Sequence, residues 1–149
     1  MKLFARFSAA LLALLFLAPI GAWADMPGAH PAYLHAMSDL RAARWLIEHH
    51  PPNWSQGIDE ADAVRQIDLA LHDLKEAAYD DGKDPDFHPH IDERPDQPGR
   101  LHQALEILHR ARDDIAREED NAYARGLRNR SLGHIDAAIH RVRKAIHEE

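Results

Sequence analysis

The sequence contains no cysteine, and this absence removes several ways of holding a protein together. Without thiols the chain forms no disulfide, carries no lipid-modified cysteine and cannot attach a c-type haem. Strand-forming patterns are missing too, because no stretch shows a sustained two-residue alternation of β-branched and aromatic residues. We therefore expect an all-α fold.

Long hydrophobic runs are also lacking, apart from one at the N-terminus. The chain starts with a short basic segment, continues with an apolar centre that is short for a membrane span, and closes on Ala22-Trp23-Ala24. This order is typical of a signal peptide that is cleaved after the last of these residues. An uncleaved N-terminal anchor is the alternative. We expect residues 1–24 to be removed and residues 25–149 to form one periplasmic or secreted domain that is not an integral membrane protein.

Positive charge is scarce in the mature chain. Lys2 and Arg6 leave with the signal peptide, so the 18 Lys and Arg fall to 16, against 25 Asp and Glu, a net charge of about −9 with neutral histidine. Nucleic acid is a poor partner for a surface of this sign. All twelve histidines follow Ala24, and their protonation in acid would take the net charge to about +3. The sequence therefore predicts a surface that responds to acidity.

Four stretches place apolar residues at i, i+3, i+4 and i+7, the spacing of an amphipathic helix. They cover residues 32–49, 60–79, 99–119 and 127–147. Asp59 is the expected N-cap of the second stretch. The predicted core includes Leu40, Ile67, Leu71, Leu74, Ile107, Ile135, Ile139 and Val142.

These stretches predict a single four-helix bundle domain. It consists of an antiparallel hairpin over about 32–79, a linker rich in Pro, Asp and His over about 80–99, and a second hairpin over about 100–147.

A repeat links the two predicted hairpins. The pattern Ile-Asp-x-Ala-x-His at 67–72 recurs at 135–140, an offset of 68 residues. The other matches join Leu34-His35 and Asp39-Leu40 to Leu101-His102 and Glu106-Ile107 at an offset of 67, and Ala43-Arg44 to Ala111-Arg112. Duplication of a hairpin about a pseudo-two-fold axis explains these offsets. Chance matching, in a chain rich in Ala, Leu, His and acidic residues, is the alternative.

Three blocks of the mature chain resemble small exported bacterial helical-bundle proteins. The blocks are His30–Arg41 (HPAYLHAMSDLR), Ala77–Lys83 (AAYDDGK) and Glu118–Asn121 (EEDN). The similarity covers most of the mature chain. No function is established for those proteins, so the resemblance implies an exported bundle and no particular activity.

Each predicted helix carries a histidine and a carboxylate four residues apart, where side chains lie side by side. The pairs are His35 with Asp39, Asp68 with His72, His102 with Glu106, and Asp136 with His140. Imidazole and carboxylate groups are suitable ligands for Zn²⁺, Cu²⁺ and Ni²⁺, so these pairs are candidate metal ligands. The alternative is a set of surface contacts worth roughly a few tenths of a kcal/mol each.

Two clusters add to the metal hypothesis. His102, Glu106 and His109 form a stripe at i, i+4 and i+7 on the third helix, and the linker holds His88 and His90 among aspartates. Tracts rich in histidine can bind metal ions. For the linker, a solvated and Pro-stiffened connection is the alternative.

Motifs for catalysis are missing from the sequence, which shows neither a nucleophile motif nor a glycine-rich phosphate loop. A haem between Met37 and His147 is disfavoured, because Met37 fits the core and His147 lies off the apolar stripe. We expect a non-enzymatic exported protein that binds transition metals. The alternative is a chaperone-like or adaptor bundle that contacts other envelope proteins.

Overall fold

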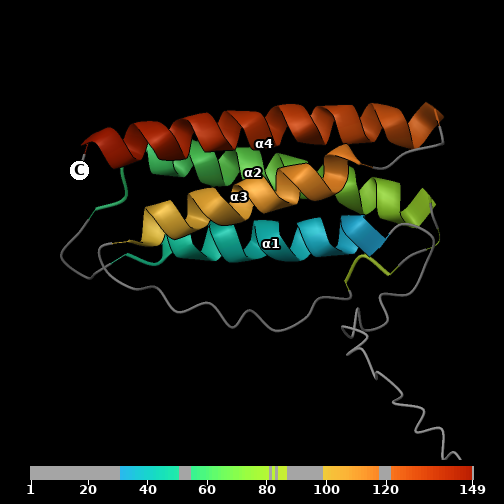
Figure 1. The fold of residues 1–149 in the computed structure, drawn as a ribbon, viewed down its shortest axis with the longest axis horizontal. Coiled ribbons are helices and arrows are strands. Elements are labelled where there is room, and N and C mark those ends of the chain that lie inside the picture. The colour runs from blue at the N-terminus through green and yellow to red at the C-terminus, as the bar shows by residue number, and fades with distance from the viewer. Residues whose placement is uncertain are drawn as a thin grey trace, which may run out of the picture.

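The fold is built from four helices, and the part of the chain that the computed structural model describes contains no strand (Figure 1). The helices are α1 (Pro31–Glu48), α2 (Ile58–Asp80), α3 (Arg100–Ala116) and α4 (Ala122–Glu148). The described residues are 31–50, 55–80, 82, 84–86, 99–117 and 122–148. None of the four described helices has an apolar stretch long enough to cross a membrane. The prediction of an all-α, four-helix fold is confirmed, whereas the signal peptide predicted over 1–24 lies outside the described residues.

Helix α4 begins earlier than the spacing predicted, at Ala122 instead of residue 127. Ala124 and Leu127 are both buried, so its first turns continue the apolar face of the helix. Gly126 lies in those turns, where the helix tolerates it at a cost of about 1 kcal/mol relative to alanine. Helix α3 ends at Ala116, three residues before the predicted end.

The start of α2 is capped differently from the prediction. Gly57 precedes the helix, and its N–H donates to Glu60 Oε2 at 2.9 Å while its C=O accepts from Ala61 N–H at 3.0 Å. A glutamate at the third helical position that reaches back in this way forms one half of a capping box. The N-cap role predicted for Asp59 is therefore wrong, because Asp59 lies inside the first turn and its carboxylate faces α4.

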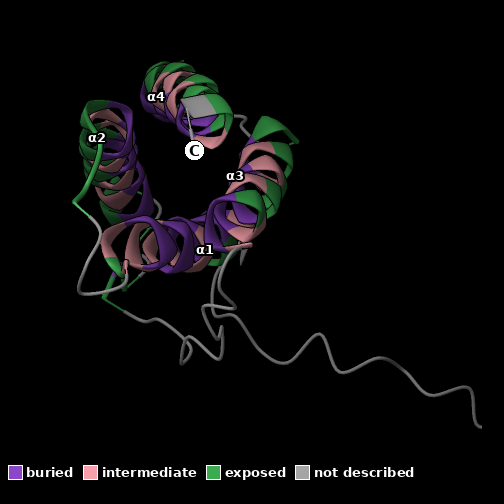
Figure 2. Ribbon diagram, turned by 90° about the vertical axis from the view of Figure 1, so that its left-hand side faces the viewer, coloured by how far each residue is buried: buried purple, intermediate pink, exposed green. Residues whose placement is uncertain are grey.

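The four helices form a square in which each helix has two neighbours (Figure 2). Helix α1 packs mainly on α3, and α2 packs mainly on α4. Among the four described helices, the backbones of those at opposite corners, α1 with α4 and α2 with α3, do not pack on each other.

The direction of the chain gives an up-down-down-up order. Helix α1 runs antiparallel to both α2 and α3 and in the same direction as α4 (Figure 1). Since α2 and α3 run in the same direction, the chain leaves α2 at one end of the bundle and enters α3 at the other. The predicted linker over 80–99 falls between these two ends.

One core receives the apolar faces of all four helices. Its largest fully buried side chains are Tyr33, Leu34, Met37, Leu40, Leu46, Ile47, Ile67, Leu74, Leu101, Ile107, Leu108 and Ile115. Of the eight residues predicted for the core, only Leu71 is half-buried, and it packs against the other apolar side chains. Burial of each leucine or isoleucine contributes about 1.5–3 kcal/mol, so the repeated apolar spacing drives this arrangement.

A buried arginine joins three helices at one end of the bundle. Arg100, at the start of α3, forms an ion pair with Glu60 of α2, and both side chains are about 95% buried. Its Nη1 also donates to the carbonyl of Ile47 at 3.1 Å, near the end of α1. The last carbonyls of a helix lack partners within the helix, and here a side chain from another helix supplies one.

Candidate functional site

The carboxylates of the predicted pairs on α2 and α4 bind arginines from neighbouring helices. Asp68 accepts a hydrogen bond from Arg44 Nε of α1 at 2.8 Å, and Asp136 accepts one from Arg112 Nε of α3 at 2.6 Å. A guanidinium carries a permanent charge and a fork of N–H donors, which suit a carboxylate better than a neutral imidazole does. The histidines of these pairs lie on the surface, namely His140 and His72, the latter 3.6 Å from Glu76.

In the predicted pair on α1, the carboxylate again binds an arginine and the histidine lies at the surface. Asp39 accepts hydrogen bonds from Arg110 of α3 at 3.2 and 3.3 Å, and His35 is exposed. Asp114 of α3 lies near both members of the pair. Burial, and next the carboxylate of Asp39, raise the pKa of the Asp114 carboxyl, and the nearby His35 partly offsets this rise.

The predicted stripe on α3 lies at the surface. His102 and Glu106 are exposed, and His109 is half-buried. The Nε2 of His109 lies 3.0 Å from Arg143 Nη2 of α4, and because arginine can only donate, this nitrogen accepts. A metal ion at His109 Nε2 would therefore have to displace Arg143.

Metal and haem ligands are not brought together in the described helices. No group of three or more His, Asp or Glu side chains among the described residues is placed to hold a metal ion. His88 and His90 lie outside the described residues. Met37 is fully buried on α1, while His147 is exposed on α4 at the opposite corner of the square, so these two side chains do not meet.

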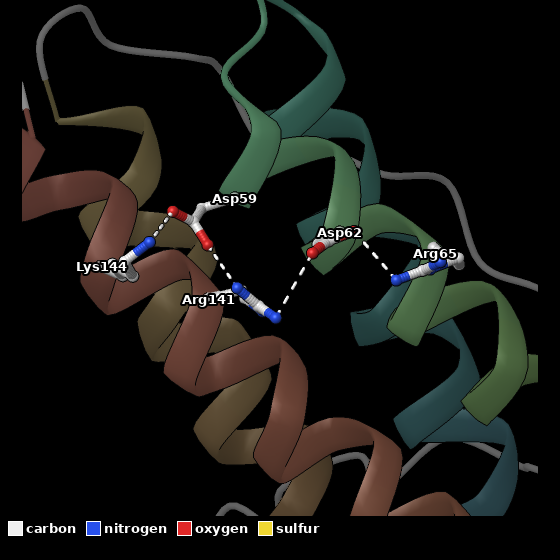
Figure 3. Close-up of polar contacts among 5 residues, drawn as sticks. All are labelled: Asp59, Asp62, Arg65, Arg141 and Lys144. Carbon is white, nitrogen blue, oxygen red and sulfur yellow. Dashed lines mark hydrogen bonds and ion pairs between the residues drawn. The ribbon is translucent and has the colours of Figure 1, made fainter.

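The densest polar cluster lies where α2 meets α4. The carboxylate of Asp59 accepts from Arg141 Nη1 and Lys144 Nζ of α4, both at 2.7 Å, and Arg141 also reaches Asp62 at 3.4 Å (Figure 3). Arg65 pairs with Asp62 from the exposed side. Hydrogen bonds from Lys144 and then from Arg141 hold the pKa of the Asp59 carboxyl below its usual range, because they stabilise its ionised form.

The same contact continues along both helices with a reciprocal pattern. Asp73 of α2 accepts from Arg130 of α4 at 3.1 Å, and Asp62 pairs with Arg141. Positions 62 and 130 are 68 residues apart, and so are positions 73 and 141. If each residue of α2 is replaced by its equivalent in α4, and each residue of α4 by its equivalent in α2, one ion pair falls on the other. We call Asp62, Asp73, Arg130 and Arg141 the α2–α4 seam.

At the centre of the seam, two residues at equivalent positions of the repeat contact each other. His134 Nδ1 lies 2.8 Å from Gln66 Oε1, and these two positions are themselves 68 residues apart. A residue that contacts its own equivalent marks the axis of a two-fold arrangement.

The contacts within each pair of consecutive helices follow the same offset. Arg44 pairs with Asp68, and Arg112 pairs with Asp136, each partner 24 residues further along the chain. The two pairs are again 68 residues apart. Sequence reasoning missed these ion pairs, although Arg44 and Arg112 were part of the repeat that could have indicated them.

Two large aromatic side chains are exposed at the end of the bundle that lies away from Asp59. Tyr79, near the end of α2, is 64% exposed, and Tyr123, near the start of α4, is 61% exposed. Since α2 and α4 are antiparallel, both tyrosines lie at the same end, where these two helices project beyond α1 and α3 (Figure 1).

The fold and its polar contacts define an all-helical four-helix bundle with an acidic α2 facing a basic α4. No protein-family model matches the chain, and no curated protein or solved structure matches it either.

Proposed function

We propose that this chain is a non-enzymatic, exported bundle of the periplasm that binds another envelope protein at its tyrosine end, defined by Tyr79 and Tyr123. The observation that carries this proposal is the exposure of both rings, at 64% and 61%, on neighbouring helices. Export is supported by the N-terminal pattern of residues 1–24, with its basic start, apolar centre and Ala-x-Ala close.

Exposed tyrosines are suited to protein recognition. Tyrosine and arginine are enriched in the cores of protein interfaces, because each buries a large area and still offers a polar group. The first turns of α4, residues 122–130, contain three arginines and no acidic residue beside Tyr123. On α2, by contrast, Tyr79 lies beside the acidic residues Glu76 and Asp80. The partner that fits this end presents apolar side chains, with carboxylates towards α4 and basic groups towards α2.

Site-specific photocrosslinking from positions 79 and 123 in cells tests this proposal. Ile58 is a matched control, because it is 84% exposed on α2 at the other end of the bundle. We expect crosslinks to one envelope protein from both tyrosine positions and none from position 58.

The test is completed by purifying the envelope protein identified by crosslinking and measuring its affinity for this chain. The double variant Tyr79→Ala, Tyr123→Ala should weaken binding at least about tenfold, as loss of central interface aromatics does. Ile58→Ala should bind like the wild type. Equal binding by the double variant, or equal crosslinking from position 58, would refute the proposed site.

We further propose that the two hairpins arose by duplication. The support is the offset of 68 residues, shared by the sequence repeat, the two ion pairs of the seam and the arginine–aspartate pairs within each hairpin. The offset of 67 in α1 and α3 then reflects one inserted residue before Arg112.

A further inference from the structure

We infer that the inner face of each hairpin also accepts the other hairpin from a second copy of this chain, which gives a hairpin-exchanged dimer. Hairpin 1 is α1 with α2, and hairpin 2 is α3 with α4. The main helix packing, α1 on α3 and α2 on α4, lies between the hairpins and not within them.

The reciprocal seam has the geometry of a contact between two copies. In a two-fold interface, residue i of one partner contacts j of the other, and j contacts i. Asp73 with Arg130 and Asp62 with Arg141 follow this rule at the offset of 68 residues, about the axis at Gln66 and His134. A hairpin from another chain therefore meets the same surface in the same register.

Charge decides which hairpins can pair. Two copies of hairpin 1 would place Asp62 against Asp73, because position 62 is equivalent to position 130. Two copies of hairpin 2 would place Arg130 against Arg141 by the same equivalence. Both arrangements bring like charges together, so only hairpin 1 with hairpin 2 is matched.

The connection between the hairpins affects whether a hairpin pairs with the other hairpin of its own chain or with that of a second chain. Helix α2 ends at Asp80, and Gly99 directly precedes α3. Eighteen residues, 81–98, lie between them in the sequence. Because the two hairpins belong to one chain, each meets the other at an effective concentration on the order of millimolar, so pairing within the chain prevails in dilute solution. The exchanged dimer forms when pairing within the chain is weakened and a matched hairpin is offered by another chain.

Two charge-reversed variants of the mature chain test this inference. The first carries Arg130→Asp and Arg141→Asp, and the second carries Asp62→Arg and Asp73→Arg. Each variant mismatches its own hairpins, so its thermal midpoint should fall by roughly 5 °C or more. Asp59 keeps Lys144 as a partner in both variants.

Mixing the two variants after joint refolding from urea gives the decisive measurement. Hairpin 1 of the first variant is acidic along the seam and matches the basic hairpin 2 of the second variant. Hairpin 1 of the second variant is basic there and matches the acidic hairpin 2 of the first variant. We expect a 1:1 complex of twice the chain mass by native mass spectrometry, with the thermal midpoint restored towards that of the wild type.

The four substitutions combined in one chain are the matched control, because they restore pairing within the chain. This quadruple variant should be monomeric and as stable as the wild type in dilute solution. If the mixture holds only monomers, or if each variant forms dimers with itself as readily as with the other, the inference is wrong, whatever the stability of the single variants.

Discussion

Among single side chains, arginine determines where the carboxylates of this bundle point. Asp39, Asp68 and Asp136 each have a histidine four residues away, yet each binds an arginine from another helix. A histidine at i±4 has to lose rotamer freedom for a contact worth only about 0.2–0.5 kcal/mol. An arginine that reaches across from the next helix forms stronger charge-assisted bonds and also connects two elements.

Asp59 should make the stability of the protein depend on acidity. Its folded-state pKa lies below the ordinary value, so its contribution is present above the unfolded pKa and is lost as the pH falls through the folded pKa. Asp59→Asn should therefore lower the thermal midpoint at neutral pH, and the gap from the wild type should close below about pH 4. Midpoints measured from pH 7 to pH 2 check this.

Asp113→Asn on α3 is the control for the Asp59 experiment, because Asp113 is exposed. It should change the neutral midpoint little, as surface substitutions usually do. A gap between Asp59→Asn and the wild type that stays constant down to pH 2 would contradict the role of the ionised carboxylate.

Within the helices, the repeated apolar spacing carries most of the stability. Ile135 lies on α4 in the repeated Ile-Asp-x-Ala-x-His pattern and is fully buried. Ile135→Ala should lower the free energy of unfolding by about 2–5 kcal/mol, because it removes buried methyl groups and leaves a cavity. Urea unfolding at neutral pH measures this loss.

Leu69 of α2 is the matched control for Ile135, because it is 41% exposed on the outside of the bundle. Leu69→Ala should cost less than about 1 kcal/mol, since a large part of its side chain is already in contact with water when the protein is folded. Equal losses for the two variants would show that the apolar stripe is not the interior of the bundle.

For the whole molecule, the binding of Zn²⁺, Cu²⁺ or Ni²⁺ stays a prediction from the sequence. If His102, Glu106 and His109 bind Zn²⁺, the double variant His102→Ala, His109→Ala should lose one bound ion per chain in calorimetric titration. Arg143→Ala should bind more tightly than the wild type, because Arg143 no longer occupies His109 Nε2. Binding should weaken in acid, because protons compete with the metal ion for its ligands.

Unchanged stoichiometry in the double histidine variant would exclude this stripe as the metal site. The helix content of that variant is the control and should equal that of the wild type. His102 is exposed and His109 is only half-buried, so both side chains can be removed without opening the core.

The sequence predicted well what depends on neighbours within one helix. Helix α2 ends at Asp80, one residue beyond the predicted end at 79, and Ile67, Leu74 and Ile107 are buried as their spacing predicted. It missed the buried pair of Arg100 with Glu60, because no periodic rule places a charged residue inside a core. It also misplaced the start of α4, whose apolar face continues on the N-terminal side of Leu127 to Ala124.

The four helices, the face that each one buries and the offset that relates the two hairpins could all be predicted from the amino-acid sequence. These features follow from local propensity and the helical period, which act over a few residues. The packing of the four helices places α1 beside α3 and brings arginines, not histidines, to the carboxylates. The physical reason is that the apolar stripes alone do not select one neighbour, whereas side chains far apart in the chain compete for each carboxylate only after the helices have packed.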